Sequence, residues 1–186
     1  MSELQKLFDE SRKVLAQADC LFTREEVESA LNHLATVISE KLSDTNPLVL
    51  CIMNGGIVPT GLLVTRLDFP LQIDYLHATR YRNKTRGSEL QWLVTPALSL
   101  EQRTVLLVDD IHDEGVTLEE IKHYCLNAGA AEVLSAVLVN KQNDRKNNTR
   151  ADFVGLDIPD RYVFGYGMDY KGLLRNASGI YAVKGL

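Results

Sequence analysis

The sequence predicts an α/β domain whose central sheet is mostly parallel and flanked by helices. Apolar runs of strand length at 48–53, 104–109 and 132–140 are separated by segments with helical periodicity. Strands that alternate with helices in this way form parallel sheets. A chain of 186 residues that is 45% hydrophobic suits one domain with a full core. We expect one domain over 1–186, divided into an N-terminal helical segment (1–44), a core (45–150) and a C-terminal region (151–186).

Two helices are expected before the first strand of the sheet. Residues 3–17 carry a helical stripe of apolar side chains. Thr23 and Glu26 form a capping box that opens a second helix, and the Ser-Asp-Thr-Asn-Pro run at 43–47 ends it. Because both helices precede the sheet, we expect them to form a peripheral cap or flank.

The remaining elements alternate in chain order. Gly129 is expected to end the longest helix of the core. The expected elements are a strand at 48–53, a helix at 59–67, a strand at 71–77, a polar loop at 80–90, a strand at 92–94, a strand at 104–109, a helix at 118–128, a strand at 132–140, a polar loop at 142–150, and short apolar pieces at 153–156, 162–166 and 180–183.

Composition excludes several classes of function. The net charge is −5, with no basic block of the kind that binds nucleic acid. No apolar run approaches the roughly 18 residues of a membrane span, and the charged N-terminus lacks a signal-peptide core. The three cysteines have no C-x-x-C spacing, which indicates reduced thiols. We expect a cytoplasmic protein that binds neither nucleic acid nor membrane.

The most informative segment is 105–118, where an apolar strand leads into a cluster of acids and then a helix. Four carboxylates at the carboxyl end of a strand repel one another, and doubly wound sheets bind ligands at this edge. Their expected occupants are a metal ion, the hydroxyls of a sugar or a developing positive charge. A solvated acidic turn is the alternative. An EF-hand is excluded, because either register puts Ile111 or His112 at its third position. The acids are Asp109, Asp110, Asp113 and Glu114.

A second turn is expected at the same edge. Asn54-Gly55-Gly56 follows the strand at 48–53, and two glycines let the backbone approach a ligand closely. This turn is not a P-loop, because no Lys-Ser/Thr pair follows Gly61. A plain tight turn is the alternative. Gly165-Tyr166-Gly167 does not form a dinucleotide fingerprint either, because Tyr170 stands where the third glycine belongs.

Taken together, these motifs resemble those of the type I phosphoribosyltransferases. The acidic segment is similar to their ribose-phosphate motif, and residues 152–176 are similar to the purine-binding region of the hypoxanthine-guanine members. The resemblance implies the type I phosphoribosyltransferase fold, with a small hood and a mobile lid loop at 80–90. It also implies an enzyme with two small-molecule substrates, a 6-oxopurine base and 5-phosphoribosyl 1-pyrophosphate.

The resemblance assigns the ribose and phosphate contacts to the acidic segment. Asp109 and Asp110 are expected to accept hydrogen bonds from the ribose hydroxyls, directly or through a metal ion. The turn that follows offers backbone N–H groups and a helix start to the 5′-phosphate. Glu114 stands where the family has Thr or Ser, so we expect its side chain to point outward. The phosphate turn comprises Asp113, Glu114, Gly115, Val116 and Thr117, and Asp113 is the expected general base.

The resemblance also assigns the other contacts. Asn54 stands where the family often has lysine. In the hypoxanthine-guanine members, an aromatic ring stacks on the base and the backbone of the next residue contacts the edge of the base. A lysine donates a hydrogen bond to the 6-oxo group. The expected purine contacts are Lys141, Tyr162, Val163 and Asp169; the pyrophosphate contacts are Asn54, Gly55, Arg80, Tyr81 and Arg175; and the Mg²⁺ ligands are Asp109, Asp110 and Asp169.

The resemblance thus implies purine salvage. Such an enzyme transfers the 5-phosphoribosyl group to hypoxanthine or guanine, gives IMP or GMP, and releases pyrophosphate. Two alternatives remain: a relative that prefers xanthine, and a non-catalytic regulator that keeps the fold and senses nucleotides. By the same resemblance, we expect a homodimer or homotetramer.

Overall fold

The computed structural model describes residues 2–80, 90–143 and 149–185. Its main part is a six-stranded sheet in the order β4-β3-β2-β5-β6-β7. The strands of this sheet are β2 (Leu48–Met53), β3 (Gln72–Arg80), β4 (Leu90–Val94), β5 (Thr104–His112), β6 (Glu132–Gln142) and β7 (Phe153–Pro159).

The strands pair as the alternating pattern predicts. Each neighbouring pair from β3 to β7 is parallel, and only the edge strand β4 runs antiparallel to its neighbour β3. The prediction of a mostly parallel sheet is therefore confirmed. Parallel strands end at the same edge, so the loops that follow β2, β5 and β6 gather there.

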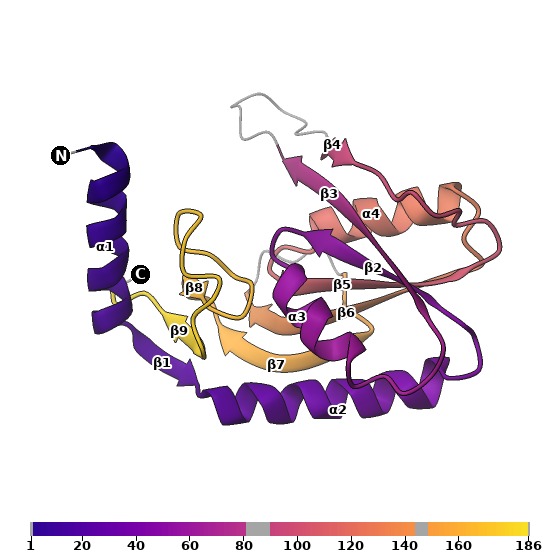
Figure 1. Ribbon diagram of the computed structural model, residues 1–186, viewed down its shortest axis with the longest axis horizontal. Helices are drawn as coiled ribbons and strands as arrows, with labels where there is room; N and C mark the ends of the chain where they lie inside the picture. The colour runs from indigo at the N-terminus through magenta and orange to yellow at the C-terminus, as the bar shows by residue number, and fades with distance from the viewer. Residues whose placement is uncertain (1, 81–89, 144–148, 186) are drawn as a thin grey trace.

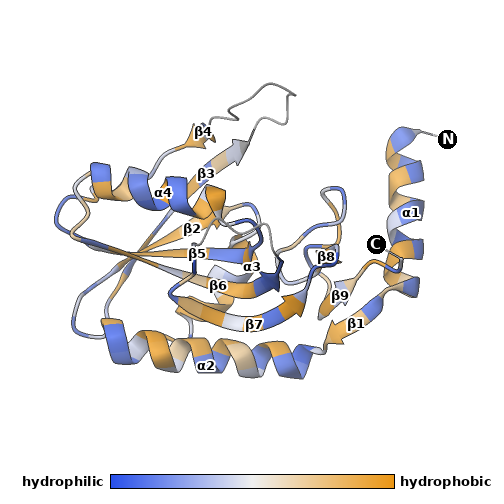
Figure 2. Ribbon diagram, turned by 180° about the vertical axis from the view of Figure 1, so that it is seen from behind, coloured by the Kyte–Doolittle hydropathy of each residue, from blue (hydrophilic) through white to orange (hydrophobic). Residues whose placement is uncertain are grey.

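Helices cover both faces of this sheet. Figure 1 shows α2 (Arg24–Leu42) and α3 (Ile57–Val64) on one side and α4 (Val116–Asn127) on the other. In Figure 2 the hydrophobic central strands lie between α2 and α4. One buried cluster joins α2 and α3 to the sheet, and a second joins α4 to its opposite face. The domain therefore has three layers.

The helix α2 belongs to the core. The predicted capping box at Thr23 and Glu26 is present. From there α2 packs along β7 and α3 and buries an apolar stripe that includes Leu31 and Ile38. The expectation that both N-terminal helices are peripheral is therefore wrong for α2. The reason is that β6 and β7 extend the sheet beyond α3, and α2 covers this extension.

A smaller antiparallel sheet, which we call the hood, lies beside the carboxyl ends of the main strands (Figure 1). It pairs β1 (Asp19–Phe22) with β9 (Ile180–Ala182), and β9 with β8 (Val163–Phe164). Here α1 (Glu3–Gln17) packs through Val14 against the hood residues Phe164 and Tyr170. The strand β1 was not predicted, because four residues between two helices carry too short a pattern.

No helix within the described ranges is both long and apolar enough to cross a membrane.

Candidate active site

The acid pair lies at the end of β5, as predicted. Asp110 is 7% exposed, and its backbone N–H donates to Oδ1 of Asp109 over 2.9 Å. Burial, followed by repulsion from Asp110, raises the pKa of Asp109 well above its ordinary value. Burial also raises the pKa of Asp110, against the opposing effects of the hydrogen bond with Asp109 and the charge of Arg175. The pair, with Asp110 buried and Asp109 partly buried, is therefore an acidic site that favours a proton or another positive charge.

The acid pair should reduce the stability of the fold at neutral pH. A carboxyl whose pKa folding raises binds its proton more tightly in the folded state. Stability therefore falls as pH rises from the ordinary aspartate value toward the raised one. We expect Asp109→Asn to raise Tm at neutral pH by about 2–4 °C for each kcal/mol of repulsion relieved. The gain should vanish below about pH 4, where the carboxyls are protonated in both states.

Calorimetry across this pH range tests the expectation. The control is Asp68→Asn, which makes the same change at an exposed position and should leave Tm nearly constant. A lower Tm for Asp109→Asn at neutral pH would show that the carboxylate stabilises the fold instead.

Two glycine turns close around the acid pair. The turn at Asn54 and Gly55 follows β2, and a Cβ at Gly55 would lie 2.2 Å from Oδ2 of Asp110. Gly167, from the hood, approaches the same point: its φ is +110°, and a Cβ there would lie 2.2 Å from the Gly55 carbonyl oxygen. A side chain at Gly55 would displace Asp110, and one at Gly167 would displace the Gly55 carbonyl. The predicted turn and the acid pair therefore share one site, which a hood turn completes.

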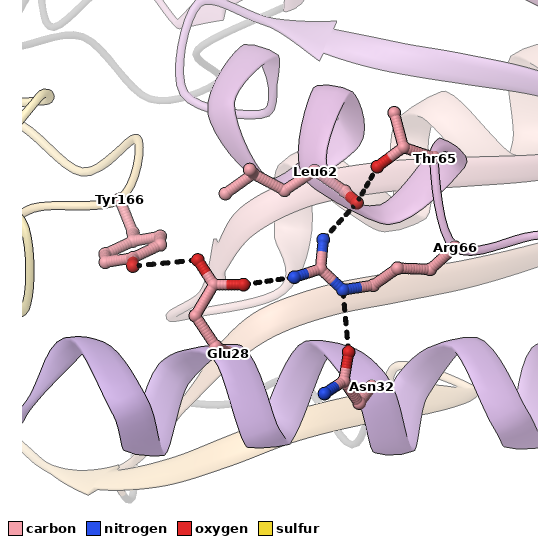
Figure 3. Close-up of polar contacts among 6 residues, drawn as sticks. All are labelled: Glu28, Asn32, Leu62, Thr65, Arg66 and Tyr166. Atoms are coloured by element: carbon pink, nitrogen blue, oxygen red, sulfur yellow. Dashed lines mark hydrogen bonds and ion pairs between the residues drawn. The ribbon is translucent and has the colours of Figure 1, made fainter.

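A network of side chains holds this hood turn, 165–167, against the helices (Figure 3). The Tyr166 hydroxyl donates to Oε1 of Glu28 over 3.3 Å, and the guanidinium of Arg66 pairs with the other Glu28 oxygen. Arg66 also donates to Oδ1 of Asn32 over 2.8 Å. Glu28 and Asn32 belong to α2, whereas Arg66 follows α3. The network thus fixes the hood turn relative to the main domain.

Arg175 lies between two of the predicted Mg²⁺ ligands, Asp110 and Asp169. Its guanidinium lies 2.7 Å from Oδ1 of Asp169 and 3.9 Å from Oδ2 of Asp110. It also donates to the Gly167 carbonyl over 2.5 Å. The structure thus brings the predicted pyrophosphate residue Arg175 to the acid pair. Within the described ranges, no three His, Cys, Asp or Glu side chains form a group suited to a metal ion. The metal assignment of Asp109, Asp110 and Asp169 stays a prediction.

The turn after β5 has the geometry of an anion site. Gly115 is in the left-handed region with a φ of +81°, and α4 begins at the next residue, Val116. Backbone N–H groups at a helix N-terminus attract phosphate. The Glu114 side chain is exposed, in agreement with its expected outward direction, and Thr117 lies in the first turn of the helix. Asp113, Glu114, Gly115, Val116 and Thr117 therefore form one continuous turn.

Beneath this turn lies a histidine that none of the predicted site motifs includes. His112 is 2% exposed, with Nδ1 3.3 Å from Oδ1 of Asn140 and Nε2 3.4 Å from the Thr149 hydroxyl. A Cβ at Gly115 would lie 2.7 Å from His112 Nε2. Strand alternation places Asp110 and His112 on the same face, and that signal was available in the sequence.

The predicted general base contacts the lysine that is predicted to bind the purine. Nζ of Lys141 donates to Oδ2 of Asp113 over 3.0 Å, and Nδ2 of Asn143 donates to Oδ1 over 2.7 Å. Lys141 is 8% exposed and lies 3.8 Å from a carboxylate oxygen of Asp160. It is therefore not a solvated strand end. Asn143 was missed because it lies just beyond the end of β6, in a segment where the sequence predicts only a polar loop.

The predicted base-contacting residues follow Asp160. Tyr162 is 39% exposed, its ring centroid is 5.6 Å from that of Tyr170, and its hydroxyl accepts from the Lys171 backbone over 3.3 Å. Val163 is buried in β8 and pairs with β9. Asp160 lies beside Lys141 and only two residues before Tyr162. The Tyr162 ring, the buried Lys141 ammonium and the acidic turn therefore belong to one region.

Part of the predicted pyrophosphate set is not described. Arg80 ends β3, and its side chain lies outside the description. Tyr81 and the other residues of the expected lid, 81–89, also lie outside the described residues.

The sheet, the acidic turn at the end of β5 and the hood define a phosphoribosyltransferase. The phosphoribosyl transferase domain model matches residues 17–171, and the chain belongs to this family. It is 30% identical to a hypoxanthine-guanine phosphoribosyltransferase of Bacillus subtilis over 88% of this chain and 92% of the relative. It is 31% identical to one from Staphylococcus epidermidis, with the same coverage of both chains.

Solved structures agree with the sequence relatives. A hypoxanthine phosphoribosyltransferase from Staphylococcus aureus superposes with a TM-score of 0.84 at 29% identity, over 89% of this chain and 91% of that chain. A hypoxanthine phosphoribosyl transferase from Trypanosoma cruzi superposes with a TM-score of 0.83 at 26% identity and the same coverage. The chain is thus similar over most of its length to hypoxanthine and hypoxanthine-guanine phosphoribosyltransferases.

Proposed function

We propose that this protein is a purine-salvage enzyme that transfers the 5-phosphoribosyl group of 5-phosphoribosyl 1-pyrophosphate to hypoxanthine or guanine. The products are IMP or GMP and pyrophosphate. The observation that carries the proposal is the 3.0 Å contact between Asp113, in the phosphate turn, and Lys141, beside the base region. It supports binding of a sugar phosphate and a base next to each other, as bond formation between them requires.

Base recognition would use Lys141, Tyr162 and Val163. An ammonium only donates hydrogen bonds, so Lys141 suits a 6-oxo group and opposes a 6-amino group. The half-exposed ring of Tyr162 offers a stacking surface, and the Val163 backbone would read the edge of the base. This set favours 6-oxopurines over adenine.

Asp113 would act as the general base. As the N9–C1′ bond forms and the C1′–O bond to pyrophosphate breaks, the purine loses a ring proton, and a carboxylate of Asp113 would accept it. Lys141 and Asn143 hold the two oxygens of this carboxylate in place. The anionic pair of Asp109 and Asp110 would accept hydrogen bonds from the ribose hydroxyls and favour the positive charge that develops at C1′.

Pyrophosphate would leave toward Arg175 and the turn at Asn54 and Gly55. Arg175 supplies a fixed positive charge, and Gly55 permits close approach of the backbone. Mg²⁺ fits this region, because it accepts one or two carboxylates and completes its shell with water and phosphate oxygens. The position of the Arg175 guanidinium between Asp110 and Asp169 also supports a cation site here, since these two carboxylates already attract one positive charge. When bound, Mg²⁺ would neutralise charge on pyrophosphate.

The two alternatives differ in their support. A non-catalytic regulator is not favoured, because the relatives carry the names of enzymes and Asp113 is present and held by Lys141. A xanthine-preferring relative differs only in how the purine 2-position is contacted. Assembly as a homodimer or homotetramer and a cytoplasmic location, without nucleic-acid or membrane partners, belong to the proposal.

A substrate panel tests the proposal. Hypoxanthine, guanine, xanthine, adenine, uracil and orotate are each incubated with 5-phosphoribosyl 1-pyrophosphate and Mg²⁺, and nucleotide formation is followed by absorbance. We expect turnover with hypoxanthine and guanine. Turnover with xanthine alone would select the xanthine-preferring alternative, and nucleotide binding without turnover of any base would select the regulator.

A further inference from the structure

The helix α1 lies almost entirely before the part of the chain that the family model matches, which begins at residue 17. Figure 1 shows α1 standing beside the hood, away from the main sheet. Val14 and Ala18 pack against a small hood cluster that contains Phe164 and Tyr170. This helix is thus an addition to the matched domain, and the contacts with Phe164, Tyr170 and Lys171 place it on the hood side of the candidate site.

One carboxylate of α1 has two partners in the hood. Oε1 of Glu10 accepts from the Tyr170 hydroxyl over 2.6 Å and from Nζ of Lys171 over 2.6 Å. These two bonds lower the pKa of Glu10, with the Lys171 bond the larger cause. The Lys171 ammonium also lies 5.4 Å from the centroid of the Tyr170 ring. The contact spans 160 residues of chain and ties α1 to consecutive residues of one loop.

Tyr170 and Lys171 belong to the loop 168–175, which also carries the predicted site residues Asp169 and Arg175. Asp169 precedes Tyr170, its Oδ2 accepts from the Gly172 backbone over 2.7 Å, and its Oδ1 pairs with Arg175. Tyr162 contacts the two residues that Glu10 holds, through the Tyr170 ring and the Lys171 backbone. The loop thus links Glu10 to the stacking ring and to the pyrophosphate side of the site.

The backbone of this loop is strained and needs external contacts. Lys171 and Leu174 have φ values of +50° and +65°, in the left-handed region that side chains other than glycine rarely adopt. Such conformations persist only where the surroundings hold them. Leu174 packs in the hood cluster, and Lys171 is held by Glu10. Removal of the Glu10 carboxylate would therefore release the loop at Lys171.

We infer that Glu10 is a positioning residue for substrate binding: through Tyr170 and Lys171, it holds loop 168–175 and the Tyr162 ring in their binding geometry. The inference rests on the proposed function for its kinetic consequence. Glu10 is not one of the predicted substrate contacts, and it acts through Tyr170 and Lys171. It affects binding rather than the chemical step, because Asp113 and Lys141 are held by contacts of their own.

Kinetics of three variants test the inference. We expect Glu10→Ala to raise the KM for purine and for 5-phosphoribosyl 1-pyrophosphate by about threefold to tenfold, with kcat changed by less than about twofold. Glu10→Gln keeps an acceptor for the Tyr170 hydroxyl, so it should recover part of the loss. The control Glu3→Ala removes an exposed acid from the first turn of the same helix and should change neither KM.

Hydrogen exchange without substrate supplies a readout that does not depend on activity. Amides of 168–175 should exchange faster in Glu10→Ala than in Glu3→Ala, while amides of β5 and β6 remain unchanged. Tm establishes that each variant folds. Should Glu10→Ala not fold, Glu10→Gln is compared with Glu3→Ala in the same way.

The outcomes separate the two proposals. An inactive wild-type protein would overturn the proposed function, and the exchange data would still decide whether Glu10 holds the loop. An active wild-type protein whose KM values stay constant in Glu10→Ala would overturn the positioning role. So would a loss confined to kcat, or unchanged exchange of 168–175.

Discussion

Asp113→Asn is expected to lower kcat by about 10²–10⁴, the range for loss of a general base. An amide retains the shape of the side chain but takes up no proton at neutral pH. Its oxygen can still accept one of the two hydrogen bonds that Lys141 and Asn143 donate to the carboxylate. The affinity for 5-phosphoribosyl 1-pyrophosphate should change little, because the phosphate turn contributes mainly backbone N–H groups. Steady-state kinetics and calorimetric titration of the sugar phosphate measure the two quantities.

A matched variant separates proton transfer from electrostatics. Asp160 is a second carboxylate beside Lys141, at 3.8 Å, and Asp160→Asn removes one negative charge without altering the phosphate turn. We expect only a few-fold change in kcat from it. If Asp113→Asn lowers kcat less than about threefold while sugar-phosphate binding is lost, Asp113 holds the ligand and the base is another group.

Lys141→Gln is expected to weaken the use of hypoxanthine about tenfold or more. A hydrogen bond to a charged donor contributes about 1.5–3 kcal/mol, which glutamine does not reproduce. The amide both donates and accepts, so it removes the conflict with the 6-amino group of adenine. The ratio of kcat/KM for hypoxanthine to that for adenine should therefore fall, since sites that leave a buried donor unpaired discriminate by up to about 10⁴–10⁵.

This variant also removes the Lys141 ammonium from Oδ2 of Asp113. A lower kcat with both bases is therefore expected, and the base ratio is the diagnostic quantity. Lys141→Arg is the control, because it keeps a donating cation and should retain the preference for 6-oxopurines. If the hypoxanthine-to-adenine ratio of kcat/KM is unchanged in Lys141→Gln, base selection depends on the backbone around Val163 and not on Lys141.

Many elements of the domain can be predicted from local sequence patterns. Apolar runs such as 104–109 predict buried strands because the sheet is covered on both faces. Since such strands end at one edge, the motifs at Asn54, Asp109 and Lys141 could be expected to meet there. The capping box at Thr23 needs only residues three apart, and it too is present. These features depend on residues that are close together in the chain, so local patterns are enough to predict them.

Other features depend on segments that are far apart in the chain. The hood pairs Asp19 with Ala182, and no local pattern sets that partnership. The same applies to the pairing of Arg175 with Asp110 and to the hydrogen bond between Tyr170 and Glu10. A side chain's partner is decided by packing, because burial makes an unpaired polar group costly and many partners could satisfy it. Which charges meet therefore depends on how distant segments pack. The acid pair and the lysine can be recognised in the sequence, but folding places Asp113 against Lys141.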